Sequence, residues 1–106
     1  MRIIKERTVY TICLIEKYKS ASENLEAWIL EVRKADWASV ADLKAAFRNA
    51  SIINRKRVVF NINGNEFRLV VDIEYRIKFV YIIWFGTHQE YQKINIKALT
   101  YGNQRY

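Results

Sequence analysis

Residues 58–73 read VVFNINGNEFRLVVDI, and this stretch decides the class of fold. Apolar and other residues alternate on both sides of Asn63-Gly64, which is the pattern of two β-strands that each bury one face. Asn-Gly is the preferred pair for a type I′ turn, because both turn positions need a positive φ. The stretch therefore predicts an antiparallel hairpin with a two-residue loop.

A two-residue loop fixes which side chains face each other. Phe60 would pair with Phe67 on an apolar face that turns toward the rest of the domain. The opposite face would carry Asn61, together with Arg57 and Arg68 as diagonal neighbours. The hairpin thus presents two cations on one polar surface.

A third strand follows the hairpin. Residues 79–85, FVYIIWF, come after a turn near residues 75–78 and are apolar on both faces. A strand of this kind is buried on both sides, so we expect it at the centre of the sheet or covered on each face. Gly86 ends the strand.

The stretch after this strand predicts a helix start. Thr87 and Glu90 have the spacing of a capping box, in which each side chain satisfies a backbone N–H at the helix end. His88, the only histidine in the chain, is then the first helical residue, and Tyr91 shares its face. The imidazole would lie at the positive end of the helix dipole, where an anion is favoured. The tail after Ile96 either continues this helix or is a frayed basic terminus.

The first half of the chain is mainly helical after a short edge strand at Arg2–Ile4. A first helix runs to about Tyr18, and its apolar face comprises Val9, Ile12 and Cys13. Ser20 and Glu23 have the spacing of a second capping box and predict a helix that ends near Asp36. Its apolar face comprises Leu25, Trp28, Ile29 and Val32.

Ser39 is the predicted cap of a third, short helix. This helix would turn Leu43, Ala46 and Phe47 inward. Trp28, Trp37 and Trp84 are interpreted as core residues. The elements together predict an α+β fold, with the N-terminal helices packed on one face of the sheet and a short helix near the C-terminus.

Length and composition favour one soluble domain over residues 1–106. The hydrophobic fraction is 51%, which is enough for a core without disulfides, and the single Cys13 cannot form an intramolecular bridge. The longest apolar stretch is far shorter than the roughly 20 residues that span a bilayer, and the charged N-terminus does not resemble a signal peptide. These features predict a cytoplasmic protein without a membrane segment.

The charge predicts a polyanionic partner. The net charge is +7, and residues 54–106 hold nine Lys and Arg against four Asp and Glu, whereas residues 1–53 hold nine against seven. Nucleic acid is the simplest partner for such a protein. The sequence has no phosphate-binding loop, no Cys/His set for zinc and no Ser nucleophile with plausible partners, so neither a metal nor a cofactor is expected.

The polar hairpin face and the last helix could line one concavity suited to RNA cleavage by the 2′-hydroxyl. That reaction needs an acid and a base, and a cation that holds the phosphate. Arg68 suits the phosphate clamp because its planar fork binds two oxygens, and His88 suits proton transfer near neutral pH. Tyr91 would stack on a base or position the phosphate. Lys56 and Arg57 would assist in holding RNA.

Simpler explanations exist for each of these residues. A histidine at a helix start is often a surface residue, and Tyr91 could serve packing alone. Exposed arginines on strands commonly block edge pairing and maintain solubility. Only the combination of these side chains favours a nuclease.

Three stretches resemble the HigB-type toxins of bacterial type II toxin–antitoxin modules, a branch of the RelE-like mRNA endonucleases. They are RVVFNINGNEFRLVV at 57–71, VYIIWFGTHQEYQKI at 80–94 and EVRKADWASVADLKAAFRNASII at 31–53. The hairpin and the GTHQEY helix start, in this order and spacing, carry most of the resemblance. The positions that match the family pattern are Asn61, Gly64, Asn65, Arg68, Thr87, His88, Glu90 and Tyr91.

The resemblance implies a small domain with a curved antiparallel sheet that cuts mRNA on the ribosome and so inhibits translation and growth. It also implies a cognate helix-turn-helix antitoxin of the HigA type, and operator DNA bound only through the toxin–antitoxin complex. On this basis Asn61 joins Lys56 and Arg57 as an RNA-binding residue, beside Arg68, His88 and Tyr91 as catalytic residues.

Two positions depart from the family pattern. Gln92 stands where an acidic residue often follows the tyrosine, and Ile83 stands where a basic residue is common. Loss of that basic side chain would weaken phosphate binding. The alternative function is therefore a non-catalytic RNA-binding or ribosome-binding module, or a degenerate toxin that retains antitoxin binding. A DNA-binding regulator acting alone is less favoured, because the first half shows no basic recognition helix.

Overall fold

The predicted hairpin is present, with a longer loop. The computed structural model describes residues 1–100, and in it β3 (Arg57–Ile62) and β4 (Phe67–Glu74) form an antiparallel pair. Residues 63–66 form the loop, in which Asn63 and Gly64 have φ values of 55° and 62°. The positive φ values predicted for the Asn-Gly pair are confirmed, whereas the two-residue loop was wrong.

The longer loop shifts the pairing of the strands by two residues. Phe60 lies opposite Leu69 and not opposite Phe67, which instead faces Ile62. Because side chains alternate between the faces with a period of two, a shift of two residues leaves each one on its predicted face. Only the cross-strand neighbours change.

The same shift separates the two arginines that were predicted to be diagonal neighbours. Arg57 pairs with Asp72, and Arg68 pairs with Asn61. Four residues along β3 separate these two pairs, which corresponds to roughly 13 Å at the rise of a strand. The polar face of the hairpin therefore has two distinct cationic positions.

Residues 1–100 form a five-stranded sheet in the order β1-β5-β4-β3-β2. The edge strands are β1 (Arg2–Ile4) and β2 (Ser51–Ile52), and β5 (Phe79–Thr87) lies between β1 and β4 as predicted. β1 runs parallel to β5, while the other pairs are antiparallel. The predicted antiparallel pairing is confirmed for β2, β3, β4 and β5, and the parallel edge strand β1 makes the sheet mixed. A parallel pair needs a long connection, which the helices between these strands provide.

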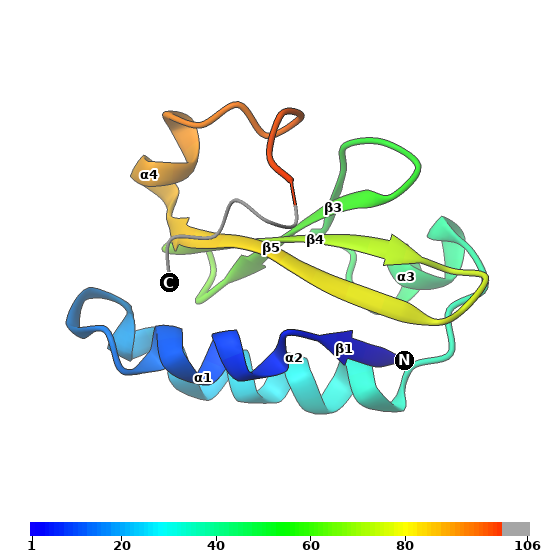
Figure 1. Ribbon diagram of the computed structural model, residues 1–106, viewed down its shortest axis with the longest axis horizontal. Helices are drawn as coiled ribbons and strands as arrows, with labels where there is room; N and C mark the ends of the chain where they lie inside the picture. The colour runs from blue at the N-terminus through cyan, green and yellow to red at the C-terminus, as the bar shows by residue number, and fades with distance from the viewer. Residues whose placement is uncertain (101–106) are drawn as a thin grey trace.

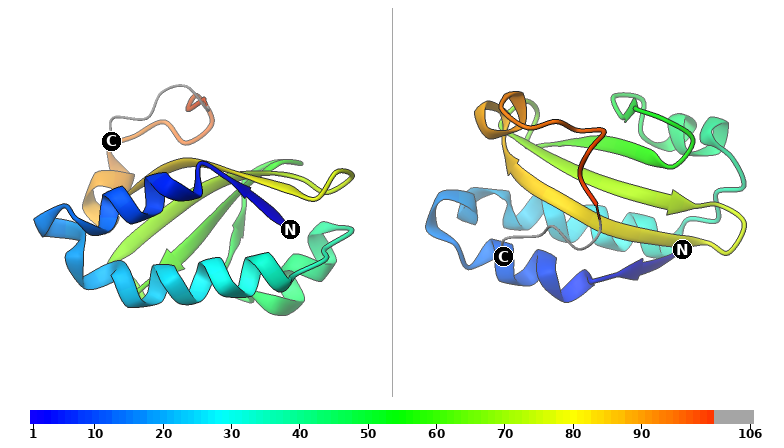
Figure 2. Two further views of the ribbon diagram at one scale, coloured as in Figure 1. Left: turned by 60° about the horizontal axis from the view of Figure 1, so that its bottom comes forward. Right: turned by 45° about the horizontal axis from the view of Figure 1, so that its top comes forward.

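Helices carry the chain from one edge of the sheet to the other. α1 (Glu6–Cys13) and α2 (Ser22–Lys34) lie on one side of the sheet, and α3 (Val40–Ala46) precedes the far edge strand (Figure 1). The short helix α4 (His88–Gln92) lies on the other side, and two further views show the same layers (Figure 2). The predicted α+β class and the helical cover of one face are confirmed.

The first helix is shorter than predicted. α1 ends at Cys13, Ile15 is extended, and a 3-10 helix, η1, covers Glu16–Ala21. In a continuous α-helix, at about 100° per residue, Tyr18 would point away from Val9. The break at Ile15 instead turns Tyr18 into the core, where it is fully buried.

The predicted Ser20 cap is wrong, and the predicted Ser39 cap is confirmed in position but not in its hydrogen bond. Ser20 lies inside η1, and Ser22 donates its N–H to the Lys19 carbonyl, because η1 runs directly into α2. Ser39 does stand at the start of α3, but its side chain makes no capping hydrogen bond, and Ala38 donates its N–H to Asp42.

Each face of the sheet has its own apolar cluster. The larger one joins the helices to the first face and includes the predicted face of α2 and two of the tryptophans; among its members are Val9, Ile12, Leu25, Trp28, Ile29, Val32, Trp37, Leu43, Phe60 and Leu69. Phe47 packs against this cluster as predicted, whereas Ala46 is exposed, contrary to prediction. The smaller cluster on the second face is formed by Val59, Val70, Ile83 and Trp84. Both faces of β5 are therefore covered, as its sequence predicted.

The tail after α4 folds back over the second face. Residues 93–100 form no helix, and Ile94, Ile96 and Leu99 pack against the smaller cluster. The predicted continuation of the helix was wrong for residues 97–100. The frayed terminus stays a prediction, because residues 101–106 lie outside the described residues. No helix within residues 1–100 has the length and apolar character needed to cross a membrane.

Gly64→Ala is expected to lower the free energy of unfolding by about 1–2 kcal/mol, because the left-handed backbone conformation is unfavourable for an L side chain. Crowding does not contribute, since an added Cβ would meet no atom within 4 Å. Gly64→Asn is the matched control and should lose less stability, because asparagine tolerates this conformation. Urea unfolding measures both values, and equal losses would contradict a conformational origin.

Candidate functional site

The capping box at the start of α4 is present. The Thr87 hydroxyl accepts the Glu90 N–H at 3.1 Å, and the Glu90 carboxylate accepts the Thr87 N–H at 2.8 Å. His88 is the first helical residue, as predicted, and its N–H donates to the Glu66 carbonyl at 2.9 Å. α4 is only five residues long, so few aligned peptide dipoles contribute to anion attraction. Binding of a phosphate here would depend on cationic side chains.

Glu90 also joins α4 to the helical layer. Its carboxylate accepts a hydrogen bond from the Tyr18 hydroxyl at 2.7 Å and pairs with the Lys17 ammonium at 2.8 Å. The hydrogen bond to Glu90 is the main cause that raises the Lys17 pKa above its ordinary value. The sequence pattern did not reveal this link, because Tyr18 was predicted to lie in a continuous α-helix.

His88 lies beside an open hollow of ≈ 400 Å³ at the hairpin end of the sheet. The hollow is lined by Lys17, Ser20, Asn65, Glu66, Phe67, Thr87, His88 and Gln89. The His88 Nε2 atom lies 3.2 Å from the Gln92 amide nitrogen. The buried Nδ1 atom has no hydrogen-bond partner within residues 1–100. A neutral ring with its proton on Nδ1 can accept the amide N–H of Gln92 at Nε2.

Arg68 lies on the second face of the sheet, between Asn61 on β3 and Gly86 on β5. The side chain is largely covered, with 9% of the residue exposed, and its guanidinium donates to the neighbouring Phe67 carbonyl at 3.0 Å. Within residues 1–100 no carboxylate forms an ion pair with it. A buried cation without a counter-ion is costly, so an anion that reached it would gain a strong partner.

Asn61 lies opposite Arg68 in the hairpin, and Tyr91 of α4 packs on the second face of the sheet. Tyr91 is half-buried, and its ring centroid lies 6.3 Å from that of Trp84 in the second apolar cluster. Asn61 is exposed and lines two hollows of ≈ 320 and ≈ 490 Å³, which it shares with residues of α2 and of the segment around Phe47 and not with Arg68, His88 or Tyr91. The strand pairing also places Arg68 next to Gly86, two residues before His88. The strand pairing therefore places Asn61, Arg68 and the start of α4 at one end of the sheet. The hollow beside His88 is not lined by Arg68, Asn61 or Tyr91, so a single concavity shared by these residues stays a prediction.

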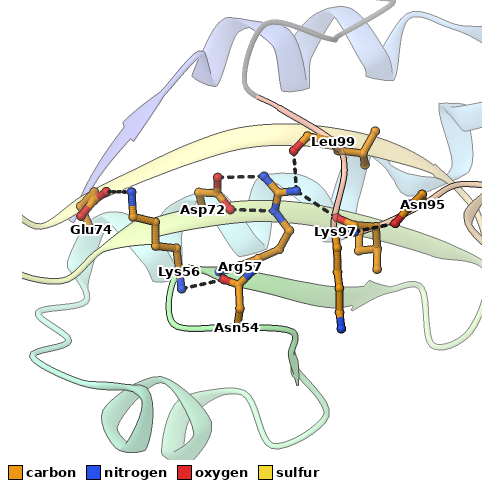
Figure 3. Close-up of polar contacts among 9 residues, drawn as sticks. Asn54, Lys56, Arg57, Asp72, Glu74, Asn95, Lys97 and Leu99 are labelled. Atoms are coloured by element: carbon orange, nitrogen blue, oxygen red, sulfur yellow. Dashed lines mark hydrogen bonds and ion pairs between the residues drawn. The ribbon is translucent and has the colours of Figure 1, made fainter.

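Lys56 and Arg57 lie at the other end of the hairpin (Figure 3). The exposed Lys56 ammonium pairs with Glu74 at 2.6 Å, and this contact raises the Lys56 pKa. Arg57 is 5% exposed, and its guanidinium binds both carboxylate oxygens of Asp72 at 2.8 and 2.9 Å. The donors of Arg57 are thus already occupied, and it does not share the position of Arg68.

The role of Asp72 was not recognised from the sequence. A carboxylate inside the apolar run LVVDI was a usable signal, because such a residue needs a partner when the strand is buried. The predicted two-residue loop placed Val70 opposite Arg57 and so concealed the pair.

Comparison with known protein families identifies a family that covers most of the chain. The family described as HigB_toxin, RelE-like toxic component of a toxin-antitoxin system, matches residues 21–94. This range includes α2, the hairpin, β5 and α4, and therefore Asn61, Arg68, His88 and Tyr91. No curated protein matches the chain.

Glu90→Ala is expected to lower the free energy of unfolding by about 1–2 kcal/mol, because the Thr87 N–H and the Tyr18 hydroxyl both lose an acceptor. Glu90→Gln retains an oxygen for these two donors and should lose less. Lys17→Ala should change stability little, since the Lys17 side chain is 58% exposed. Thermal and urea unfolding compare the three variants, and a Lys17→Ala effect as large as that of Glu90→Ala would contradict this ranking.

Proposed function

Because the chain belongs to the HigB family of RelE-like toxins, we propose that it cleaves mRNA on the ribosome and thereby inhibits translation and growth. The observation that supports this proposal is the Arg68 guanidinium, a largely buried cation with no carboxylate partner among residues 1–100, beside Asn61 and near the His88 helix. A phosphodiester supplies the negative charge that this position lacks.

In the proposed reaction the 2′-oxygen of a nucleotide attacks the adjacent phosphorus. The O2′–P bond forms, the P–O5′ bond breaks, and the 2′-hydroxyl proton is lost while the 5′-oxygen gains one. Arg68 binds the phosphate oxygens as charge accumulates, and His88 transfers one of the protons. Tyr91 stacks on a base or positions the phosphate, and Asn61 binds RNA beside Arg68. No metal takes part.

The ribosome supplies part of the catalysis in this proposal. Correct alignment of the 2′-hydroxyl with the scissile bond can account for several kcal/mol of the barrier. An enzyme with one histidine and one nearby guanidinium can then be sufficient.

Arg68 is mostly covered, so phosphate contact requires local movement around it. Lys56 is exposed and could bind the RNA backbone, whereas the donors of Arg57 are occupied by contacts within the protein.

An antitoxin is the partner that membership of the family implies. We propose a helix-turn-helix antitoxin of the HigA type, with operator DNA bound only by the complex of the two proteins. Activity on ribosomes would place the protein in the cytoplasm.

Two observations favour the second candidate, a toxin relative that binds RNA or the ribosome without cutting. Ile83, at the position where the family commonly has a basic residue, is fully buried in the second apolar cluster. Arg57 is likewise engaged by Asp72. Both reduce the positive charge available to a phosphate, so binding could persist where cleavage does not.

Arg68→Ala and His88→Ala are each expected to lower the rate of cleavage of translated mRNA at least tenfold. The first removes the phosphate clamp, and the second removes the proton-transfer group. Arg55→Ala is the matched control, because Arg55 is an exposed arginine just before the hairpin and its loss changes the net charge equally. Circular dichroism verifies folding, and wild-type rates from folded Arg68→Ala or His88→Ala would contradict the assigned role.

Cleavage of translated mRNA is expected to be much faster than cleavage of the same RNA free in solution, because the ribosome orients the reacting groups. Primer extension on both substrates measures the ratio, and equal rates would contradict ribosome dependence.

Induced expression of the protein in cells separates the two candidate functions. Growth arrest with fragmented mRNA that disappears in His88→Ala supports the nuclease, and arrest without fragmentation supports the binding module.

A further inference from the structure

Residues 93–100, here called the C-terminal strap, cover the second face of the sheet although they form no helix or strand. Ile94, Ile96 and Leu99 pack on the smaller apolar cluster, and Tyr91 of α4 belongs to the same contact set. Within the strap, Lys97 donates its N–H to the Asn95 side chain, and Ala98 donates to the Asn95 carbonyl. The strap is therefore a turn seated on an apolar surface.

Arg57 joins this strap to the sheet. One edge of its guanidinium holds both oxygens of Asp72, while its Nη1 atom donates to the carbonyls of Ile96, at 2.9 Å, and Leu99 (Figure 3). Carbonyl groups that are covered but lie outside helices and strands need a hydrogen-bond donor. Here the Arg57 side chain is the donor for two such carbonyls, those of Ile96 and Leu99. Asp72 balances the charge that would otherwise make the buried Arg57 unfavourable.

Lysine could not make the same set of contacts. A guanidinium has a planar fork with donors on three nitrogens, whereas an ammonium is a single point of charge. The four bonds of Arg57 point toward two different segments, the strand β4 and the strap. An Arg57→Lys substitution therefore preserves the charge next to Asp72 but cannot hold both segments together.

The strap bears on the candidate site because α4 cannot hold its position alone. Isolated helices shorter than about 12–15 residues are marginal in water, and α4 has five residues. Its start is tied by Glu90 to Tyr18 and Lys17, and its end continues directly into the strap. Loosening the strap would free one of the two ends of the helix that carries His88 and Tyr91.

We propose that Arg57 is a positioning residue of the candidate site, which holds the strap on the sheet and thereby fixes α4. The expected effect of Arg57 on cleavage rests on the proposed nuclease function, whereas its effect on the position of α4 does not. Arg57 contacts neither RNA nor the reacting atoms in this role, so its predicted function as an RNA-binding residue is replaced by one exerted through Ile96 and Leu99.

The test is Arg57→Lys, with Arg55→Lys as the matched control at an exposed position two residues earlier. Hydrogen exchange at the amides of α4 and the strap should accelerate at least tenfold in Arg57→Lys, while exchange in β4 and β5 stays unchanged. The kcat for translated mRNA should fall at least tenfold, with KM within twofold of wild type. Arg55→Lys should match wild type in all three measurements.

Leu99→Ser provides a second variant if Arg57→Lys does not fold, since it weakens the strap and leaves the Arg57–Asp72 pair intact. It should show the same exchange pattern and the same loss of kcat. Unchanged exchange in α4 and the strap would overturn the proposal, and so would fast exchange there with a wild-type kcat. If the wild-type protein cleaves no RNA, the nuclease function fails, and exchange at Tyr91 and Gln92 still decides whether Arg57 positions α4.

Discussion

Both faces of β5 are apolar, and the chain must therefore cover the sheet twice. α1 and α2 cover the first face, and α4 with the residues that follow it covers the second. A strand with this composition would otherwise leave Ile83 and Trp84 in water. The second cover is short and largely irregular, so polar contacts have to define its position. The hydrogen bonds of Glu90 and Arg57 provide such contacts for α4 and the C-terminal strap.

Two buried arginines on the second face differ in the partners that their guanidinium groups have. Arg57 has a carboxylate on the adjacent strand and two strap carbonyls, so its charge and its donors are satisfied. Arg68 has one neighbouring carbonyl and, within residues 1–100, no counter-ion. Burial of an ion commonly costs several kcal/mol, and an unmatched one is hard to explain by stability alone. The first arginine is satisfied within the fold, whereas the second has no ion-pair partner among residues 1–100.

Alternation in the hairpin was predictable, but its register was not. The period of two in VVFNI and FRLVV assigned every side chain to its correct face, because that assignment depends on parity alone. Loop length sets the pairing, and Asn63-Gly64 with positive φ values occurs here inside a four-residue loop. The shift brought Asp72 opposite Arg57 and so changed the interpretation of one predicted RNA-binding residue. The Thr87–Glu90 capping box was predictable because it depends only on neighbouring residues. The Ser20 cap was wrong because Ser20 lies inside η1, whose Lys19 carbonyl accepts the N–H of Ser22 at the start of α2.

The residues that match the family pattern include some whose contacts stabilise the fold and others whose polar groups are incompletely paired. Thr87 and Glu90 satisfy each other and tie α4 to the helical layer, and Gly64 permits a left-handed turn. These positions would be needed in any protein with this fold, whether or not it cuts RNA. Within the described part of the chain, Arg68 instead has a carbonyl partner but no counter-ion, and the buried Nδ1 atom of His88 has no hydrogen-bond partner. Incompletely matched polar groups destabilise a fold, and a ligand that completes them is the explanation on which the proposed function rests. The case for chemistry therefore depends mainly on these two side chains, whereas Thr87, Glu90 and Gly64 belong to the scaffold around them.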